Sequence, residues 1–135
     1  MEKISPEEYR KILDGIDLKN ILLSELKATI KHELLSEGMK IGIKENTHYA
    51  YEDNELIVTN KYVLTAKNND KKIVLKIEGI FIVVFESEYE ITDDFFEIYK
   101  DISLPLNVWP FFRELVNSTT SRMNIPPFTL PLLKR

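Results

Sequence analysis

The alternation of apolar and polar residues divides the chain into a short first helix, a sheet and a second helical region. Ser5 to Glu8 has the residues that open a helix: a capping serine, a proline at the first position and two acids in the first turn. We expect this helix to be short and to end near Gly15.

The segment from Leu18 to Leu35 fits two kinds of structure. Apolar residues recur at every fourth position, as on one face of a helix that Gly38 would end. The segment also alternates with charged residues, as in a strand with one face in solvent. Propensity favours the helix because leucine, glutamate, lysine and alanine dominate. From these residues alone, both structures stay open.

The middle of the chain predicts strands joined by short turns. Ile41 to Tyr51 alternates, and Leu56 to Lys67 is rich in the β-branched and aromatic residues that strands prefer. Asn68 to Lys71 has the composition of a turn, and Ile73 to Phe85 predicts a long strand. Turns this short join antiparallel neighbours, so we expect a meander.

Helices return after the sheet. We expect Thr92 to cap a short helix and Asn107 to cap the main C-terminal helix, with Pro110 in its first turn, where a missing N–H costs nothing. An extended apolar tail, Phe128 to Leu133, follows this helix. An apolar stripe at helical spacing marks the helix itself: Phe112, Leu115, Val116, Thr119 and Met123.

Length and charge narrow the class of protein. The 135 residues predict a single domain, with a helix in 1–16, a sheet in 18–86, helices in 93–124 and a tail in 125–135. The net charge of −4 argues against a nucleic-acid partner. The absence of cysteine is compatible with a cytoplasmic location. No apolar run reaches the roughly 20 residues of a membrane helix, so we expect no membrane insertion.

The residue types and spacings that catalysis needs are missing. Four scattered glycines predict no phosphate-binding loop, and the two histidines, His32 and His48, have no partner at metal-ligand spacing. No serine lies in a nucleophile motif. The sequence therefore predicts no catalytic residue, no metal and no cofactor, and we do not expect an enzyme.

Apolar surface is the feature that stands out. Ile80 to Phe85 is apolar on both faces, which predicts a strand covered on both sides. One main helix covers only one face of a sheet, so a second cover is required, either another copy of the chain or a partner.

Three segments in the same order resemble the bacterial SecB-type protein-export chaperones: Lys76 to Phe81, Trp109 to Leu115, and Ile125 to Pro131. The resemblance implies an α+β fold, a four-stranded antiparallel sheet with a long C-terminal helix and shorter helices packed on one face. It also implies a strand where Leu18 to Leu35 lies. Four subunits would assemble as a dimer of dimers, a homotetramer with the long helices between sheets.

The activity that the resemblance implies is that of an ATP-independent holdase for unfolded polypeptide clients. The chain ends at Arg135 without the family's metal-binding extension, so docking on the export motor ATPase is in question. Short relatives protect antitoxins in toxin–antitoxin systems. The predicted client-binding residues are Tyr49, Tyr51, Phe81, Phe85, Trp109, Phe112, Phe128 and Leu130, and the predicted oligomer interface is Leu115, Val116, Thr119 and Met123.

Two other functions remain open from the residues. The first is a dedicated adaptor that binds one partner peptide, such as a segment of an antitoxin, and ignores generic unfolded chains. The second is an enzyme for a small ligand, which would require an enclosed cavity with converging polar groups.

Overall fold

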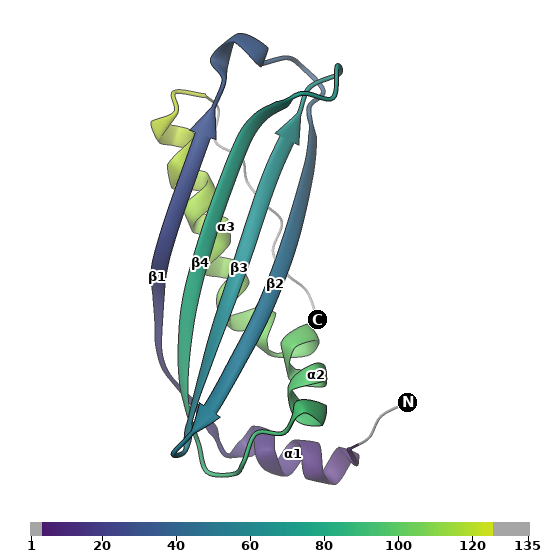
Figure 1. Cartoon of the computed structure of the whole chain (residues 1–135), viewed down its shortest axis with the longest axis vertical. Helices are drawn as coiled ribbons and strands as arrows, with labels where there is room; N and C mark the ends of the chain where they lie inside the picture. Colours follow the sequence, from purple (N-terminus) through teal and green to yellow (C-terminus); the bar gives the residue numbers. More distant parts are fainter. Residues whose placement is uncertain (1–3, 126–135) are drawn as a thin grey trace.

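The computed structural model describes residues 4–125 as a four-stranded sheet with helices on one side (Figure 1). All neighbouring strands are antiparallel, and their order is β1-β4-β3-β2. This is the predicted α+β architecture. The elements, in chain order, are α1 (Pro6–Asp14), β1 (Ile16–Ile30), the 3₁₀ turn η1 (His32–Leu34), β2 (Lys40–Glu52), β3 (Glu55–Lys67), β4 (Ile73–Ser87), α2 (Asp93–Ile102) and α3 (Leu104–Arg122).

The two short helices begin where the sequence predicts. The Ser5 hydroxyl accepts a hydrogen bond from the Glu8 N–H at 3.1 Å, and the Thr92 hydroxyl accepts one from the Phe95 N–H at 3.2 Å. Each cap satisfies a backbone donor that the helix itself leaves without an acceptor. Gly15 follows the last residue of α1, as expected.

The ambiguous segment is a strand. β1 pairs with β4 from Ile16 opposite Ser87 to Ile30 opposite Leu75. Pairing with a neighbour along this whole length outweighs the helix propensity of the residues. The register shifts between Leu18 and Asn20 and again between Leu23 and Glu25, which is the pattern of β-bulges.

Tight turns set the register of the remaining strands. Asp53 and Asn54, between β2 and β3, both have positive φ, 52° and 66°. Asp and Asn tolerate this conformation, and two such residues give a hairpin the twist that its strands require. In the β3–β4 turn, the Asn68 side-chain oxygen accepts hydrogen bonds from the N–H groups of Asp70 and Lys72.

The core lies between the sheet and α3, which crosses its rear face in the view of Figure 1. Gly79 allows the close approach of helix and sheet, since a Cβ there would lie 3.0 Å from Leu115 Cδ2. The fully buried residues of β3 and β4 alternate along each strand and face the helices: Leu56, Val58, Asn60, Leu64 and Ala66 on β3, and Ile77 and Val83 on β4.

The start of the long helix differs from the prediction. The helix begins at Leu104, directly after α2, with Ser103 as its N-cap residue and Pro105 in its first turn. Asn107 therefore lies inside the helix and caps nothing, and Pro110 is an interior proline. Burial of the first turn explains the difference, because Leu104 and Pro105 pack into the core. That gain outweighs the hydrogen bond that Pro110 removes.

The opposite face of the sheet carries no described helix (Figure 1). Ile80, Ile82 and Val84 lie on this outer face and are half-buried by their neighbours in the sheet. β4 is thus apolar on both faces, as the sequence indicates. Within residues 4–125, however, only the helix side is covered, and the second cover that we expected is not part of the described chain.

Candidate functional site

Three predicted client-binding residues are core residues of the single chain. Phe81, Phe85 and Phe112 are at most 3% exposed. Phe112 stacks on the Tyr62 ring with centroids 4.7 Å apart, and Phe85 meets Tyr99 edge to face at 5.9 Å. Contact between these three side chains and a client stays a prediction, and their burial leaves almost no exposed surface for it.

Tyr49, Tyr51 and Trp109 are half-buried, so part of each ring is accessible. They lie on the helix side of the molecule, on β2 and α3. The Trp109 ring centroid is 5.7 Å from that of Tyr62. The Tyr51 hydroxyl donates a hydrogen bond to the Asn54 side chain at 3.3 Å. These three residues are the predicted aromatic contacts that a client can reach without rearrangement.

Tyr49 also joins β2 to α2. Its hydroxyl donates a hydrogen bond to the Asp93 carboxylate in the first turn of α2, and its ring lies 4.3 Å from the Phe96 ring. Burial, together with the hydrogen bond to Asp93, raises the pKa of the Tyr49 hydroxyl to about 12. The hydroxyl is therefore neutral at physiological pH and acts as a hydrogen-bond donor.

The predicted interface residues face their own sheet. Leu115, Val116 and Thr119 of α3 are buried, and Met123 packs against the same core. They hold α3 on the sheet of one subunit. A role for them between subunits stays a prediction. The last two predicted site residues, Phe128 and Leu130, lie outside the described residues.

The exposed apolar surface lies elsewhere, and sequence reasoning missed most of it. On β1, Leu18, Leu23 and Leu26 face the helix side and are 42–45% exposed, while Leu22 faces the outer side at 42%. Leu106 and Phe111 on α3 are nearly half exposed. The adjacent pair Leu22-Leu23 was the available signal, because a strand with apolar residues on both faces needs two covers.

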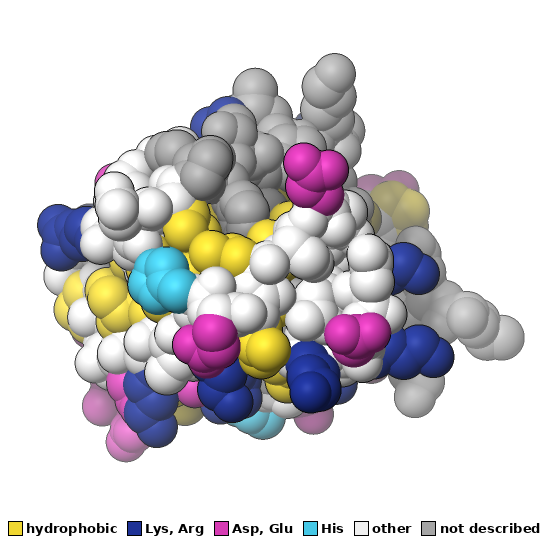
Figure 2. Space-filling view, turned by 90° about the horizontal axis from the view of Figure 1, so that it is seen from above, with side chains coloured by type: hydrophobic (Ala, Val, Ile, Leu, Met, Phe, Trp, Pro, Cys, Tyr) yellow, Lys and Arg dark blue, Asp and Glu magenta, His cyan; other side chains and the backbone are white. Residues whose placement is uncertain are grey.

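A shallow groove joins part of this surface. It has a volume of about 310 Å³ and lies between the start of β1 and the start of α3. Figure 2 views the opposite end of the molecule, which carries η1 and the β3–β4 turn, and there too hydrophobic side chains are visible between polar ones. The groove residues are Leu13, Ile16, Leu18, Phe85, Tyr99, Ser103, Leu106 and Asn107.

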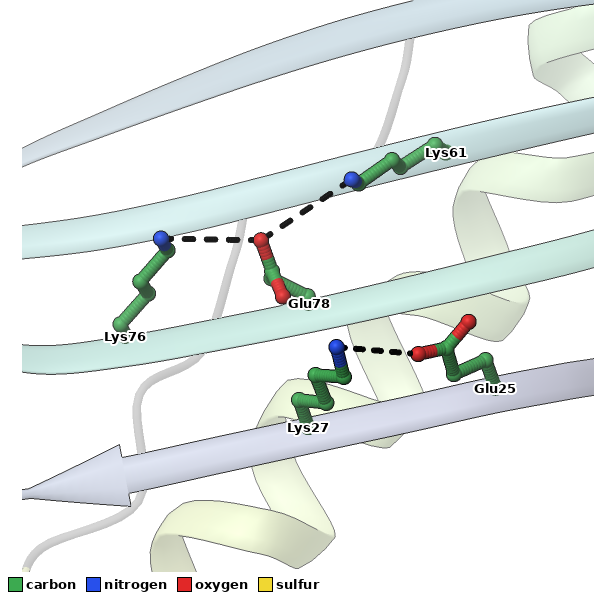
Figure 3. A network of polar contacts seen from close by, with 5 residues as sticks. All are labelled: Glu25, Lys27, Lys61, Lys76 and Glu78. Carbon is green, nitrogen blue, oxygen red and sulfur yellow. Dashed lines mark ion pairs between the residues drawn. The ribbon is translucent and has the colours of Figure 1, made fainter.

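Charged residues gather on the outer face of the sheet. Glu78 on β4 lies 3.6 Å from the Lys76 ammonium and 4.0 Å from that of Lys61 on β3, and Lys27 pairs with Glu25 on β1 at 3.3 Å (Figure 3). These pairs are partly in solvent, where each contributes little to stability. They make this part of the outer face polar, in contrast to the helix side.

Three further pKa shifts within residues 4–125 do not indicate an acid–base pair. Burial raises the pKa of Tyr62 and of Tyr99, and a hydrogen bond to Glu86 raises that of Lys19. These shifts hold the groups further from neutral pH, whereas proton transfer needs groups that titrate near it. No set of three or more His, Cys, Asp and Glu side chains among residues 4–125 is arranged to hold a metal ion. In the same residues, no helix is both long and apolar enough to cross a membrane.

Comparison with known proteins gives the fold a name. No family model matches the sequence, and no curated protein matches it. The structure is similar to that of the SecB-like chaperone Rv1957 of Mycobacterium tuberculosis, solved in complex with a ChAD peptide from the HigA1 antitoxin. The TM-score is 0.78 at 20% sequence identity, over 91% of this chain and 94% of that one.

A second similar structure is a protein of unknown function from Streptococcus agalactiae. It has a TM-score of 0.53 at 10% identity, over 87% of this chain and 97% of that one. Together with the strand order and the helix positions, the comparison with the mycobacterial chaperone identifies the fold as SecB-like, which the sequence resemblance implied. At these identities the likeness concerns the fold.

Proposed function

We propose that this chain is an ATP-independent chaperone that holds unfolded or extended polypeptides on its apolar surface. The observation that carries the proposal is the exposed apolar surface on the helix side of a SecB-like fold. Leu18, Leu23 and Leu26 of β1 and Leu106 and Phe111 of α3 contribute to it.

Apolar contact suits a protein that must accept many clients. Burial of one leucine side chain contributes about 1.5–3 kcal/mol, and this gain does not depend on the sequence around it. An unfolded client offers such side chains, whereas its native state hides them. A protein that binds only the unfolded chain lowers the concentration free to aggregate.

Self-association is the second part of the proposal. Among the described residues, β1 is an edge strand with exposed leucines on both faces, and surface of this kind is usually covered by another subunit. We place the contact between copies on β1 and on the exposed side of α3, while Leu115, Val116, Thr119 and Met123 hold each α3 in place. A dimer of dimers would bring several client surfaces together, so that weak contacts with one long chain add up.

The dedicated adaptor is the alternative, and one observation favours it. The similar mycobacterial chaperone was solved with a peptide of an antitoxin bound. By analogy, this chain would bind one segment of an antitoxin tightly. Delivery of clients to an export motor ATPase is a role within the first proposal. Identification of the client distinguishes these roles.

Aggregation assays test the proposal. A chemically denatured protein is diluted into buffer with and without the chain, and light scattering is followed with and without ATP. We expect scattering to be suppressed equally in both conditions. Unchanged scattering at a severalfold excess of the chain would overturn the holdase. A peptide array then separates the alternatives, because a holdase binds many apolar segments and an adaptor binds one.

A further inference from the structure

The outer face of the sheet carries opposite charges at its two ends. Near the β2–β3 hairpin, four acids form a row across the strands, each opposite the next in the register: Asp17, Glu86, Glu55 and Glu52. At the other end lies a group of six lysines, which we call the lysine field. Its members are Lys27 on β1, Lys76 on β4, Lys61 and Lys67 on β3, and Lys40 and Lys44 on β2.

Alternation along the strands places the lysine field on the outer face. Ala66 is buried on the helix side of β3, so Lys67 beside it points to the outer face. Lys40 lies directly opposite Lys67 and shares its face, as does Lys44 four positions further along β2. The other three members are the lysines drawn with their acidic partners in Figure 3.

Three members of the lysine field are not neutralised by an acid. The two glutamates within the field, Glu25 and Glu78, pair with the lysines of Figure 3. Among the described residues, no ion pair involves Lys40, Lys44 or Lys67, and all three are exposed. Lys40 and Lys67 also oppose each other directly, and like charges in such a pair destabilise a sheet. The arrangement therefore costs stability within the subunit, whereas a negatively charged partner would relieve it.

The lysine field fits a broad anionic surface. Its six lysines and two glutamates have a net charge of +4, although the whole chain has a net charge of −4. Platforms for single-stranded nucleic acid stack bases on aromatic rings. The aromatic residues of the four strands all pack on the helix side, so the lysine field has none. Lysine clusters of this size bind anionic lipid headgroups.

We propose that the lysine field binds the surface of a membrane rich in anionic lipids, without insertion. β2 runs from Lys40 at one end to Glu52 at the other, 13 residues that span about 40 Å. This span is several times the Debye length of about 8 Å at physiological salt. A tilted molecule therefore holds the lysine field on the headgroups while the acid row stays beyond strong repulsion.

The proposed membrane contact leaves the apolar surface free. The exposed leucines Leu23 and Leu26 lie on the helix side, which would face away from the lipid. The expected dimer of dimers, with the long helices between sheets, would also keep the outer faces at its surface. The contact is thus separate from the proposed chaperone surface and does not depend on that function.

Vesicle flotation tests the proposal. The protein is mixed with vesicles of equal parts phosphatidylcholine and phosphatidylglycerol, or of phosphatidylcholine alone. We expect it to float with the anionic vesicles at low salt, and to be released at about 0.5 M salt, where charges are screened within a few ångströms. Failure to float with the anionic vesicles at low salt would overturn the proposal. Equal flotation with both vesicles would indicate apolar adsorption and would overturn it too.

Charge reversal locates the contact. Lys40→Glu with Lys67→Glu replaces one like-charge pair by another and is expected to lower the affinity for anionic vesicles at least about tenfold. The matched control is Arg10→Glu with Lys11→Glu, which changes the net charge equally on α1 and should bind like the parent. An equal loss in both variants would show that net charge alone governs binding, and the lysine field would not be the site.

Two further measurements separate this contact from other partners. A fluorescent RNA oligonucleotide is titrated with the protein in an anisotropy assay. Binding of the RNA without binding of anionic vesicles would overturn the assignment to lipid. We also expect the variant with Lys40→Glu and Lys67→Glu to suppress client aggregation like the parent. Loss of suppression in this variant alone would place the lysine field in the client surface and overturn its separate role.

Discussion

Tyr49 shows how a single side chain connects the layers of this protein. It is half-buried on β2, its ring contacts that of Phe96 at a tilt, and it donates a hydrogen bond to Asp93. The phenol must be protonated to donate, and its pKa of about 12 lies above the ordinary value of 10.0. Because the folded state binds this proton more tightly than the unfolded state, the hydroxyl stabilises the fold only while it is protonated.

The pH dependence of stability follows from the sign of that shift. The contribution of Tyr49 is present in full below pH 10 and is lost as the pH rises towards about 12. We expect Tyr49→Phe to lower the free energy of unfolding at pH 8 and to lose less stability than the parent between pH 9 and 11. Urea unfolding at a series of pH values measures both effects.

Tyr51→Phe is the matched control, since it removes a hydroxyl two residues away, bonded to the loop residue Asn54. If Tyr49→Phe loses as much stability as the parent protein between pH 9 and 11, the role given to the Tyr49–Asp93 contact is contradicted.

At the scale of residues, the sequence predicts local contacts well and burial poorly. The caps Ser5 and Thr92 were predictable because each bonds to a backbone group three residues away. Aromatic side chains carry no such local information. Phe112 in the core and Phe111 in solvent are neighbours of one residue type, and only the position of α3 on the sheet separates them.

Among the elements, α3 departs most clearly from the sequence prediction. Proline inside a helix removes one backbone hydrogen bond and is disfavoured by about 3 kcal/mol. For this reason the sequence predicted that Pro110 lies in the first turn of the helix. The prediction was wrong because the residues before Pro110 are also helical, and Leu104 and Val108 among them are buried in the core. Tertiary packing has overridden a local preference here.

The cost of this override can be measured. Pro110 is exposed, so an alanine there needs no repacking and restores a donor to the Leu106 carbonyl. We expect Pro110→Ala to stabilise the fold by about 1–2 kcal/mol, after allowance for the greater freedom of the unfolded chain. Urea unfolding gives the change, and an unaltered or lower midpoint would contradict it. Pro105→Ala is the control and should give no gain, since Pro105 lies in the first turn and is buried.

β1 shows a different limit of prediction. Its residues satisfy helix and strand patterns equally, and no local contact decides between them. The decision comes from β4, which pairs with β1 along its length and lies more than 40 residues further along the chain. Such an element is identified from sequence only when the whole sheet is considered, and here the family resemblance supplied that information.

For the whole molecule, the proposed self-association predicts the mass of the particle in solution. We expect the chain to form a species near four times its mass of 15.8 kDa. Leu23→Lys with Leu26→Lys places two charges on the exposed helix side of β1. These charges should prevent burial against another copy and reduce the mass to a smaller species. Light scattering after size-exclusion chromatography measures it.

The matched control for the assembly is Ile57→Lys. Ile57 is similarly exposed, at 37%, but it lies on the outer face of β3. The control should keep the parental mass, and far-ultraviolet circular dichroism should show all variants folded. A parental mass for the double variant would place the contact between copies elsewhere than on β1.

The overall architecture could be predicted because hydrophobic periodicity records which face of each strand is buried. The neighbouring positions of β2, β3 and β4 followed from the short turns between them, whereas no local signal placed β1 beside β4. Which apolar residues are exposed was predicted least well, because exposed apolar surface and a core use the same residue types. Leu18 and Leu26 on the surface cannot be distinguished by type from Leu56 and Leu64 in the core.

The position of β1 beside β4 has a consequence for biosynthesis. The partner of the first strand ends at Ser87, so some 57 residues are made after Ile30 before the sheet can close. At about 5–20 residues per second, the ribosome needs roughly 3–11 s for this stretch. During that interval a leucine-rich segment with high helix propensity has no strand to join. A nascent copy of this protein would then present the kind of segment that its finished copies are proposed to hold.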